Sequence, residues 1–385
     1  MGKKITVKKG NKTYRGTNGK DTIEIVAKAG NKTNIIALGG NDIIKVRGGS
    51  DHTIDAGDGS DKLYVYAGKV KKATLGKGND KVFVTGGTLK SVNLGAGKNT
   101  ITVTGGTVSS ITGGAGVDTI DVSRQKKLNI NAGSGDDSIT INGIDNSYFS
   151  KVSTGMIRAG AGSDTITINK GGFYKIDASD GNDVVKVAGG SNIVSGGNGK
   201  DTITINSKYA NAVDGGLGND RITLSGKGYN SALIGGNGND TIIVKNTHTT
   251  DFFNVAEGNS GNDTYHVYSL DHNLFINNGP HLSTDVDVLN IHCSRFEVGL
   301  LNYDPDYDAL IINGHVVVAG VSSLSRIIVD GYEFTASEAI SAAYYIDTGN
   351  VIGEWINEYS SNLNKFAYGE AISNELARRI GYKGK

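Results

Sequence analysis

Residues 196–205 read Gly-Gly-Asn-Gly-Lys-Asp-Thr-Ile-Thr-Ile, and residues 215–224 repeat the pattern as Gly-Gly-Leu-Gly-Asn-Asp-Arg-Ile-Thr-Leu. Each stretch places a glycine-rich turn directly before a segment in which polar and apolar residues alternate. Such alternation is typical of a β-strand with one buried face. The aspartates of the two stretches lie 19 residues apart, so we expect one turn and one strand to recur at that interval.

Aspartates recur at about this interval over residues 21–263, and Asn99 fills one position in the series. One interval lengthens to 27 residues, where residues 145–149 form an insertion that we place on the edge of the short turns. With the Asp counted as position six, position four is always Gly, and positions eight and ten are apolar. The aspartates of the series are Asp21, Asp42, Asp61, Asp80, Asp118, Asp137, Asp164, Asp183, Asp201, Asp220, Asp240 and Asp263.

Each repeat also contains a second short apolar stretch, so that one unit has two strands and two turns. One such coil cannot bury its own apolar side chains, but coils stacked about 4.8 Å apart share a continuous core and pair their backbones in parallel. A helical interpretation fails, because glycine every few residues costs about 1 kcal/mol each in a helix. We therefore predict an all-β protein, a parallel β-roll or β-solenoid of about thirteen 19-residue turns, with a small β cap and C-terminal helices.

Stacking places the position-six carboxylates in a column along one edge. Neighbours about 5 Å apart repel by roughly 3 kcal/mol at an effective dielectric constant of about 20, so the column requires cations. Calcium suits it, because Ca²⁺ accepts irregular cages of carboxylate and carbonyl oxygens. The alternative is that each Asp only caps a turn. The loop glycines whose backbone carbonyls we expect to face calcium are Gly113, Gly116, Gly196, Gly199, Gly215, Gly218, Gly235 and Gly238.

Four loops match Gly-Gly-x-Gly-x-Asp in full and resemble the RTX (haemolysin-type) calcium-binding repeat, a known repeat motif. In that family, stacked loops form a parallel β-roll, and each Asp binds calcium with backbone carbonyls; the resemblance implies this role for the twelve aspartates. The family's repeat is nine residues and places loops on both edges. One loop per 19 residues predicts several Ca²⁺ ions along one edge only. Asp21 and Asp42 lack a glycine at position two, and Asn99 lacks a carboxylate, so weak or empty sites are expected there.

The period divides the chain into four expected regions. Residues 1–15 are a leader or cap, and residues 16–268 are the calcium-binding repeats. Residues 269–335 hold strand-like runs that resemble the capping domain of RTX proteins, and residues 336–385 form a helical tail with apolar stripes over 351–380. The tail is a candidate secretion signal, since type I secreted members of the family carry such a signal at the C-terminus.

Composition limits the cellular context. The chain has 39 basic and 39 acidic residues, so no global footprint of nucleic-acid binding is visible. No run of 18 apolar residues predicts a membrane span, and the single Cys293 excludes an internal disulfide. The N-terminus lacks the apolar core of a cleavable signal peptide. We therefore expect an extracellular or cell-surface protein whose partners are calcium, type I export machinery and a cell-surface or glycan ligand.

No catalytic motif is found. The sequence contains neither His-Glu-x-x-His nor Gly-x-Ser-x-Gly, which are signatures of zinc proteases and of lipases. The spacing of His266, His272, His281 and His292 matches no zinc site. We expect no enzyme, but an exported structural or binding module that folds on meeting extracellular calcium.

Two alternatives stay open. One is the repeat-bearing part of a secreted hydrolase or glycan-active enzyme. The other is an adhesin or ice-binding module that uses threonines at positions seven and nine, such as Thr100 and Thr102. Lysines at equivalent positions, including Lys62 and Lys81, interrupt this array, and threonine also favours strands for its β-propensity alone.

Overall fold

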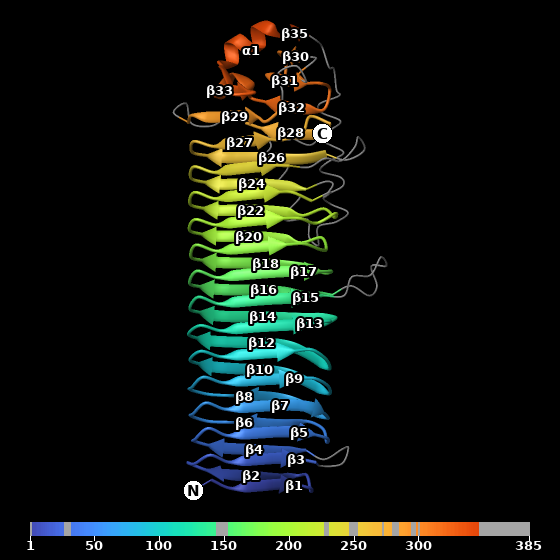
Figure 1. Ribbon diagram of the computed structural model, residues 1–385, viewed down its shortest axis with the longest axis vertical. Helices are drawn as coiled ribbons and strands as arrows, with labels where there is room; N and C mark the ends of the chain where they lie inside the picture. Colours follow the sequence, from blue (N-terminus) through green and yellow to red (C-terminus); the bar gives the residue numbers. More distant parts are fainter. Residues whose placement is uncertain are drawn as a thin grey trace. The chain divides into compact units, whose positions relative to one another are not determined.

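The structure, a computed structural model, describes residues 2–26, 32–143, 153–226, 231–245, 253–271, 273–278, 285–293, 298 and 301–345. It is a parallel β-solenoid of about 13 turns, as the 19-residue period predicts. The chain divides into two compact units, Met1–Val184 and Val185–Lys385. In each unit, every coil adds one strand to sheet A and one to sheet B (Figure 1). The insertion at 145–149, the apolar stripes of 351–380, and His272 and His281 lie outside the described residues.

The first unit stacks nine strands in each sheet. Those of sheet A are β1 Lys4–Val7, β3 Thr22–Ile25, β5 Ile43–Arg47, β7 Lys62–Ala67, β9 Lys81–Val84, β11 Thr100–Val103, β13 Thr119–Ser123, β15 Ser138–Asn142 and β17 Thr165–Lys170. Those of sheet B are β2 Lys12–Thr17, β4 Thr33–Leu38, β6 His52–Asp55, β8 Lys69–Thr74, β10 Thr88–Ala96, β12 Thr107–Ala115, β14 Lys127–Ser134, β16 Thr154–Ala161 and β18 Phe173–Asp180. β19 (Val184–Val187) lies at the division between the units.

In the second unit the strands again alternate between sheet A and sheet B, until antiparallel strands interrupt this order near its C-terminal end. Its sheet A strands are β21 Thr202–Ile205, β23 Arg221–Leu224, β25 Thr241–Val244, β27 Thr264–Val267, β29 Asp287–Ile291, β33 Leu324–Val329 and β34 Tyr332–Phe334. Its sheet B strands are β20 Ile193–Asn198, β22 Ala212–Leu217, β24 Ala232–Asn237, β26 Phe253–Ser260, β28 Asn273–Asn277, β30 Leu301–Asp304, β31 Ala309–Ile312, β32 Val316–Ala319 and β35 Tyr344–Tyr345.

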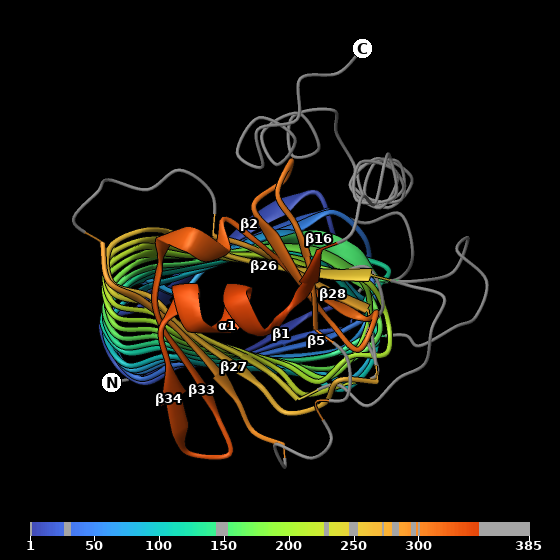
Figure 2. The same ribbon diagram turned by 90° about the horizontal axis from the view of Figure 1, so that it is seen from above.

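The core of each unit lies between the two sheets (Figure 2). It includes the apolar side chains at positions eight and ten of sheet A together with those of sheet B. Ile101 of β11 lies opposite Val82 of β9 and Ile120 of β13, and all three side chains are fully buried. The outward side chains of the same strands are polar or charged at most positions. The strand period of two thus sets which face is buried, as the alternation predicts.

Parallel stacking extends beyond residues 16–268 at both ends. β1 pairs in parallel with β3, and β2 pairs in parallel with β4, so that most of residues 1–15 already form part of a coil. In the second unit, β29 pairs in parallel with β27 and places Val288 opposite Thr264. Residues 287–291 therefore continue sheet A in the same way as the repeats before them.

The parallel stacking of the second unit gives way to antiparallel pairing near its C-terminal end. β31 pairs antiparallel with both β30 and β32. β33 and β34 form a hairpin whose two turn residues, Asp330 and Gly331, have φ values of 54° and 76°, as a tight two-residue turn requires. A short helix, α1 (Ala336–Ala342), follows and begins with a capping box between Thr335 and Glu338. Among the described residues, none of the helices has the length and apolar character needed to cross a bilayer.

Candidate metal centre

The recurring aspartates form a hydrogen-bonded column within each unit. Each lies directly before a strand of sheet A, and each side chain is buried. The backbone N–H of one Asp donates to Oδ1 of the Asp in the next coil, over 2.6–2.8 Å, from Asp21 to Asp183 in the first unit and from Asp201 in the second. Asn99 takes the place of one Asp in the first column. One oxygen of each acceptor carboxylate therefore fixes the main chain of the preceding coil.

The second oxygen of most of these carboxylates has no hydrogen-bond partner, although it is buried. This holds for Oδ2 of Asp42, Asp61, Asp80, Asp118, Asp137, Asp164, Asp220, Asp240 and Asp263. A buried carboxylate oxygen without a donor is costly, and native proteins satisfy nearly all such atoms. The repetition of the same unsatisfied atom in coil after coil indicates a ligand that complements it.

Asn99 shows what kind of ligand the loop requires. Its side-chain Oδ1 accepts from the backbone of Asp80, as an Asp would, and its Nδ2 lies 3.4 Å from the carbonyl oxygen of Gly95 and 3.3 Å from that of Gly97. The amide donor thus serves two loop carbonyls. In the coils whose Oδ2 atoms have no donor, a carboxylate oxygen replaces this amide donor, and a carboxylate can give no hydrogen to a loop carbonyl. A cation is the group that complements such a set.

Further oxygens converge on the same place in the loops that have glycine at position one. A Cβ atom added at Gly215 would overlap Oδ2 of Asp220 and the carbonyl oxygen of Gly235 in the next coil. The same holds at Gly235 for Asp240. Among the described residues, no three His, Cys, Asp or Glu side chains gather into a metal cluster, so a bound cation must take most of its ligands from the backbone. Ca²⁺, which accepts carboxylate and carbonyl oxygens in irregular cages, fits this donor set.

The loop backbone keeps one conformation in the repeats after the first. Gly116, Gly199, Gly218 and Gly238 at position four have φ values between 112° and 131°, a region that residues with side chains rarely adopt. Position two of these loops also has positive φ, and three residues other than glycine adopt it there: Leu38 (81°), Ser179 (81°) and Asn259 (74°). In the loop before Asp21, Thr17 and Gly19 do not have positive φ. The loop geometry is therefore kept at three positions that lack glycine, but not in the first loop.

Burial raises the pKa of the column carboxylates. It raises the pKa of Asp61, Asp137 and Asp240 to about 7, and that of Asp263 to about 8, and the charges of neighbouring aspartates add to the increase. The backbone N–H bond to each carboxylate opposes the shift in pKa. Without a cation, part of the column would hold protons at neutral pH, which is the expected behaviour of crowded, desolvated carboxylates.

The two ends of the Asp series differ from its middle. Both oxygens of Asp21 accept hydrogen bonds from the chain, including 2.6 Å from the backbone N–H of Thr17, so Asp21 closes a turn. At the other end, Asp287 accepts from the backbone N–H of Asp263 at 2.7 Å. Asp287 falls within residues 269–335, the expected cap, and its loop lacks the glycines of the repeats; its spacing of 24 residues from Asp263 is the signal that connects it with the column.

A second ladder of hydrogen bonds runs along the same edge at position five, where the sequence had not predicted one. The Asn41 side chain accepts from the backbone N–H of Ser60 at 2.8 Å, and Asn79 accepts from Lys98 at 2.9 Å. In the second unit, Asn219 accepts from Asn239 at 2.8 Å. The recurrence of Asn and Ser one residue before the Asp was the signal for it. This ladder is neutral in most coils and ties the loops together beside the carboxylate column.

The opposite edge of the second unit carries a third ladder, made of uncharged side chains. The backbone N–H of Asn192 donates to Oδ1 of Asn211 at 2.9 Å, Asn211 to Oγ of Ser231 at 3.2 Å, and Ser231 to Oδ1 of Asn254 at 3.0 Å. Asn192, Asn211 and Ser231 directly precede strands of sheet B, as the aspartates precede strands of sheet A, and Asn254 is the second residue of β26. An amide or hydroxyl there closes the turn without adding charge.

The remaining residues singled out in the sequence form no metal cluster. His266 Nδ1 and His292 Nε2 lie 2.7 Å apart as a hydrogen-bonded pair, and Tyr268 stacks on His292 with ring centroids 4.1 Å apart. Burial lowers the pKa of both histidines. Cys293, the single cysteine of the chain, is half-buried.

Comparisons with known proteins agree with this geometry. The family model "RTX calcium-binding nonapeptide repeat (4 copies)" matches residues 175–204. No curated protein matches the chain. Among solved structures, the chain is similar to a hyperactive, Ca²⁺-dependent, β-helical antifreeze protein from an Antarctic bacterium, with 23% identity over 69% of this chain and 84% of that chain, and a TM-score of 0.52. At this identity the likeness concerns the fold.

The matched segment contains the loop that ends at Asp201 and the strand that follows it. The repeats and the solenoid indicate a structural module rather than an enzyme. These similarities support a calcium-binding β-helical module. The chain is therefore a parallel β-solenoid in which residues 175–204 match the RTX calcium-binding repeat.

Proposed function

We propose that the chain is an exported module that is unfolded at the low calcium concentration of the cytoplasm and folds in extracellular calcium. The observation that carries this proposal is the column of buried carboxylates whose Oδ2 atoms have no donor. In the unfolded chain these groups are hydrated, whereas in the folded coils they are desolvated and close together. Folding without a cation therefore incurs a repeated electrostatic cost, and cation binding provides free energy that folding requires.

We further propose that the ions lie along the Asp edge only, with ligands from Asp42 to Asp263 and the loop carbonyls, and that Asp287 completes the last site. The uncharged ladder on the opposite edge of the second unit supports this, because Asn192 and Asn211 already satisfy their turns. Asp21 is left out of the ligand set, since both of its oxygens accept hydrogen bonds.

The C-terminal region is proposed to close the second unit. β31 and β30 are antiparallel additions to sheet B after β32, and such a change ends the series of identical coils, as terminal caps do in repeat proteins. The secretion signal proposed for residues 336–385 coincides with the described chain only in α1 and β35.

The test is far-UV circular dichroism of the purified chain during a calcium titration, with magnesium as the control ion. We expect a cooperative change from coil to β with calcium and little change with magnesium, which prefers a strict octahedron and keeps its waters. A β spectrum that is unaffected by a strong chelator would contradict coupled folding.

A pair of matched variants tests whether calcium binds at the column of aspartates. Asp137→Asn removes a carboxylate with a buried, unpartnered oxygen, whereas Asp121→Asn removes an exposed carboxylate from the outer face of β13. Both change the net charge equally. We expect Asp137→Asn to bind less calcium per chain, and Asp121→Asn to bind as much as the unaltered protein. Equal binding by all three would contradict the assignment of the column as the metal site.

The threonine face supports no second function. In the first unit, Thr100, Thr119, Ser138 and Thr165 lie in register over four coils. Lys62 and Lys81 precede them in the same row, so that the flat hydroxyl surface is short. Strand propensity accounts for such a row.

A further inference from the structure

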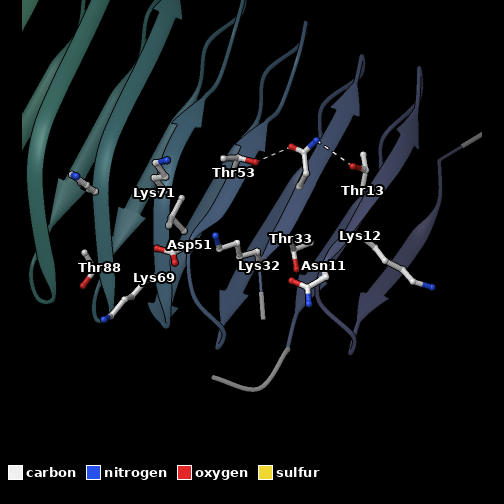
Figure 3. A pocket seen from close by; sticks show the side chains of 13 residues that line it. Asn11, Lys12, Thr13, Lys32, Thr33, Asp51, Thr53, Lys69, Lys71 and Thr88 are labelled. Atoms are coloured by element: carbon white, nitrogen blue, oxygen red, sulfur yellow. Dashed lines mark hydrogen bonds between the residues drawn. The ribbon is translucent and has the colours of Figure 1, made fainter. Parts of the chain in front are cut away.

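The outer face of sheet B in the first unit contains an open groove of about 590 Å³ that the calcium edge does not include. It crosses the strands from β2 to β10, which amounts to four steps between coils, or about 19 Å at the usual spacing of neighbouring strands. Figure 3 shows its side chains, which come from five successive coils. The charged residues that line the groove are Lys12, Lys32, Lys69, Lys71, Lys90 and Asp51.

These lysines give the groove a strong positive charge. All five are exposed, and within the described part of the chain none of them forms an ion pair. Lys71 lies at an irregularity in the stacking: His52 pairs with Val70 and Thr53 with Lys72, so Lys71 is an additional residue that has no counterpart in the register of β6. Such irregularities commonly redirect a side chain.

The floor of the groove is polar and ordered. Thr53 donates from Oγ1 to Oδ1 of Asn34 at 2.8 Å, and Asn34 donates from Nδ2 to Oγ1 of Thr13 at 3.4 Å, which links three coils in a row (Figure 3). Thr33 also lines the groove; it is 3% exposed, and its Oγ1 has no hydrogen-bond partner. Hydroxyl and amide groups between cationic side chains are suited to a ligand that carries both hydroxyl groups and negative charges.

We propose that this groove binds an anionic polysaccharide whose sugar units carry carboxylate or sulfate groups. The lysine ammonium groups pair with the regularly spaced anions, and the row of Thr13, Asn34 and Thr53 accepts and donates hydrogen bonds to sugar hydroxyls.

The composition of the groove disfavours other polyanions. Its lining residues include no aromatic side chain, whereas proteins that bind single-stranded nucleic acid stack bases on aromatic rings. They include no arginine, the residue favoured for two-pronged recognition of phosphate. Val70 is the one apolar lining residue, and it is itself buried. The groove therefore offers no apolar surface on which the side chains of a partner protein or the acyl chains of a lipid could pack.

The experiment measures binding of the full chain to dextran sulfate and to polygalacturonate, with neutral dextran and oligothymidylate as comparison polymers. Free calcium is held constant in the millimolar range and checked with an electrode, because polyuronates themselves bind calcium. The two acidic polymers distinguish sulfate from carboxylate. Circular dichroism of each sample shows that the protein is folded, so that a failure of calcium-coupled folding is recognised separately from a failure of glycan binding.

The matched variants each remove three lysines from the same unit. Lys69→Gln, Lys71→Gln and Lys90→Gln together alter the groove, whereas Lys45→Gln, Lys62→Gln and Lys81→Gln together alter the outer face of sheet A. We expect the groove variant to bind the acidic polymer about tenfold more weakly, since modest ion-pair contributions add at one ligand. The sheet A variant should bind almost as the unaltered protein does.

Three results would overturn the proposal. The first is an equal loss of affinity in both triple variants, which would indicate general charge attraction. The second is that neither acidic glycan binds at physiological ionic strength. The third is that oligothymidylate binds more tightly than both glycans through the same lysines, which would assign the groove to nucleic acid.

Discussion

At the scale of the residue, Asn99 is informative because it differs from its neighbours by one group. It occupies the column in register between Asp80 and Asp118, and its amide satisfies two carbonyls that a carboxylate cannot. This loop is therefore complete without metal. The neighbouring loops, with the same backbone and a carboxylate, are not.

Asn99→Asp should create a metal site and a metal requirement together. In the calcium-free protein, the variant should be less stable than the parent, because it buries one more carboxylate between two others. With calcium, it should bind one further ion per chain. Equilibrium dialysis with a calcium indicator measures the stoichiometry, and urea unfolding in chelator measures the stability.

The control is Asn93→Asp, which adds the same charge at an exposed position on the outer face of β10. It should change neither the calcium stoichiometry nor, beyond a few tenths of a kcal/mol, the stability. Equal effects of the two substitutions would show that charge alone, and not the loop, is responsible.

At the scale of the element, the loop before each strand of sheet A behaves as a fixed unit. Leu38 keeps a φ of 81° at position two, although a side chain there is strained. Its side chain is 39% exposed, so that packing contributes little in return. Gly57, which occupies position two of the following loop, has a φ of 99°.

Leu38→Gly should therefore stabilise the protein by about 1 kcal/mol, because glycine adopts positive φ without steric cost. Thermal unfolding in saturating calcium measures the gain. Leu217, which is 50% exposed at position three and does not have positive φ, provides the control: Leu217→Gly should be neutral or destabilising. A loss of stability in Leu38→Gly would show that the side chain, not its backbone strain, dominates at that position.

The sequence predicted the element pattern where the period was regular, and it failed where the local signal changed. Positions eight and ten marked the core of both units, since alternation determines which face is buried. Asp287 was assigned to the cap and not to the column, because its loop lacks the glycines that identified the other loops. The ladder of Asn192, Asn211 and Asn254 could not be recognised from spacing, because asparagine is common in turns of every kind. Three-dimensional register, not residue type, reveals it.

At the scale of the whole molecule, the pKa shifts predict an unusual pH dependence for the calcium-free protein. Burial and neighbouring charges raise the pKa of Asp61, Asp137, Asp240 and Asp263 to about 7 or 8 in the folded chain, whereas an unfolded Asp has a pKa of about 3.9. Between these values the folded state binds more protons than the unfolded state. The stability of the calcium-free protein should therefore rise as the pH falls from about 8 to about 4.

With saturating calcium the dependence should reverse over the same range, because protons compete with calcium for the carboxylates. Urea unfolding at several pH values, in buffer freed of metal by a chelating resin and again with calcium, measures both curves. Metal-free stability that increases with pH would contradict the desolvated column.

The direction of the hydrogen bonds between aspartates gives each unit a polarity. Within each unit the N–H at position six donates to a side chain that belongs to the following coil, as from Asp21 to Asp42 in the first unit and from Asp263 to Asp287 in the second. If the N-terminus of the chain emerges first, each donor N–H reaches the solvent before the coil that carries its acceptor. If the C-terminus emerges first, the acceptor side chain is already in a folded coil when the next donor arrives. Each folded coil then acts as a template for the coil that follows it into the solvent.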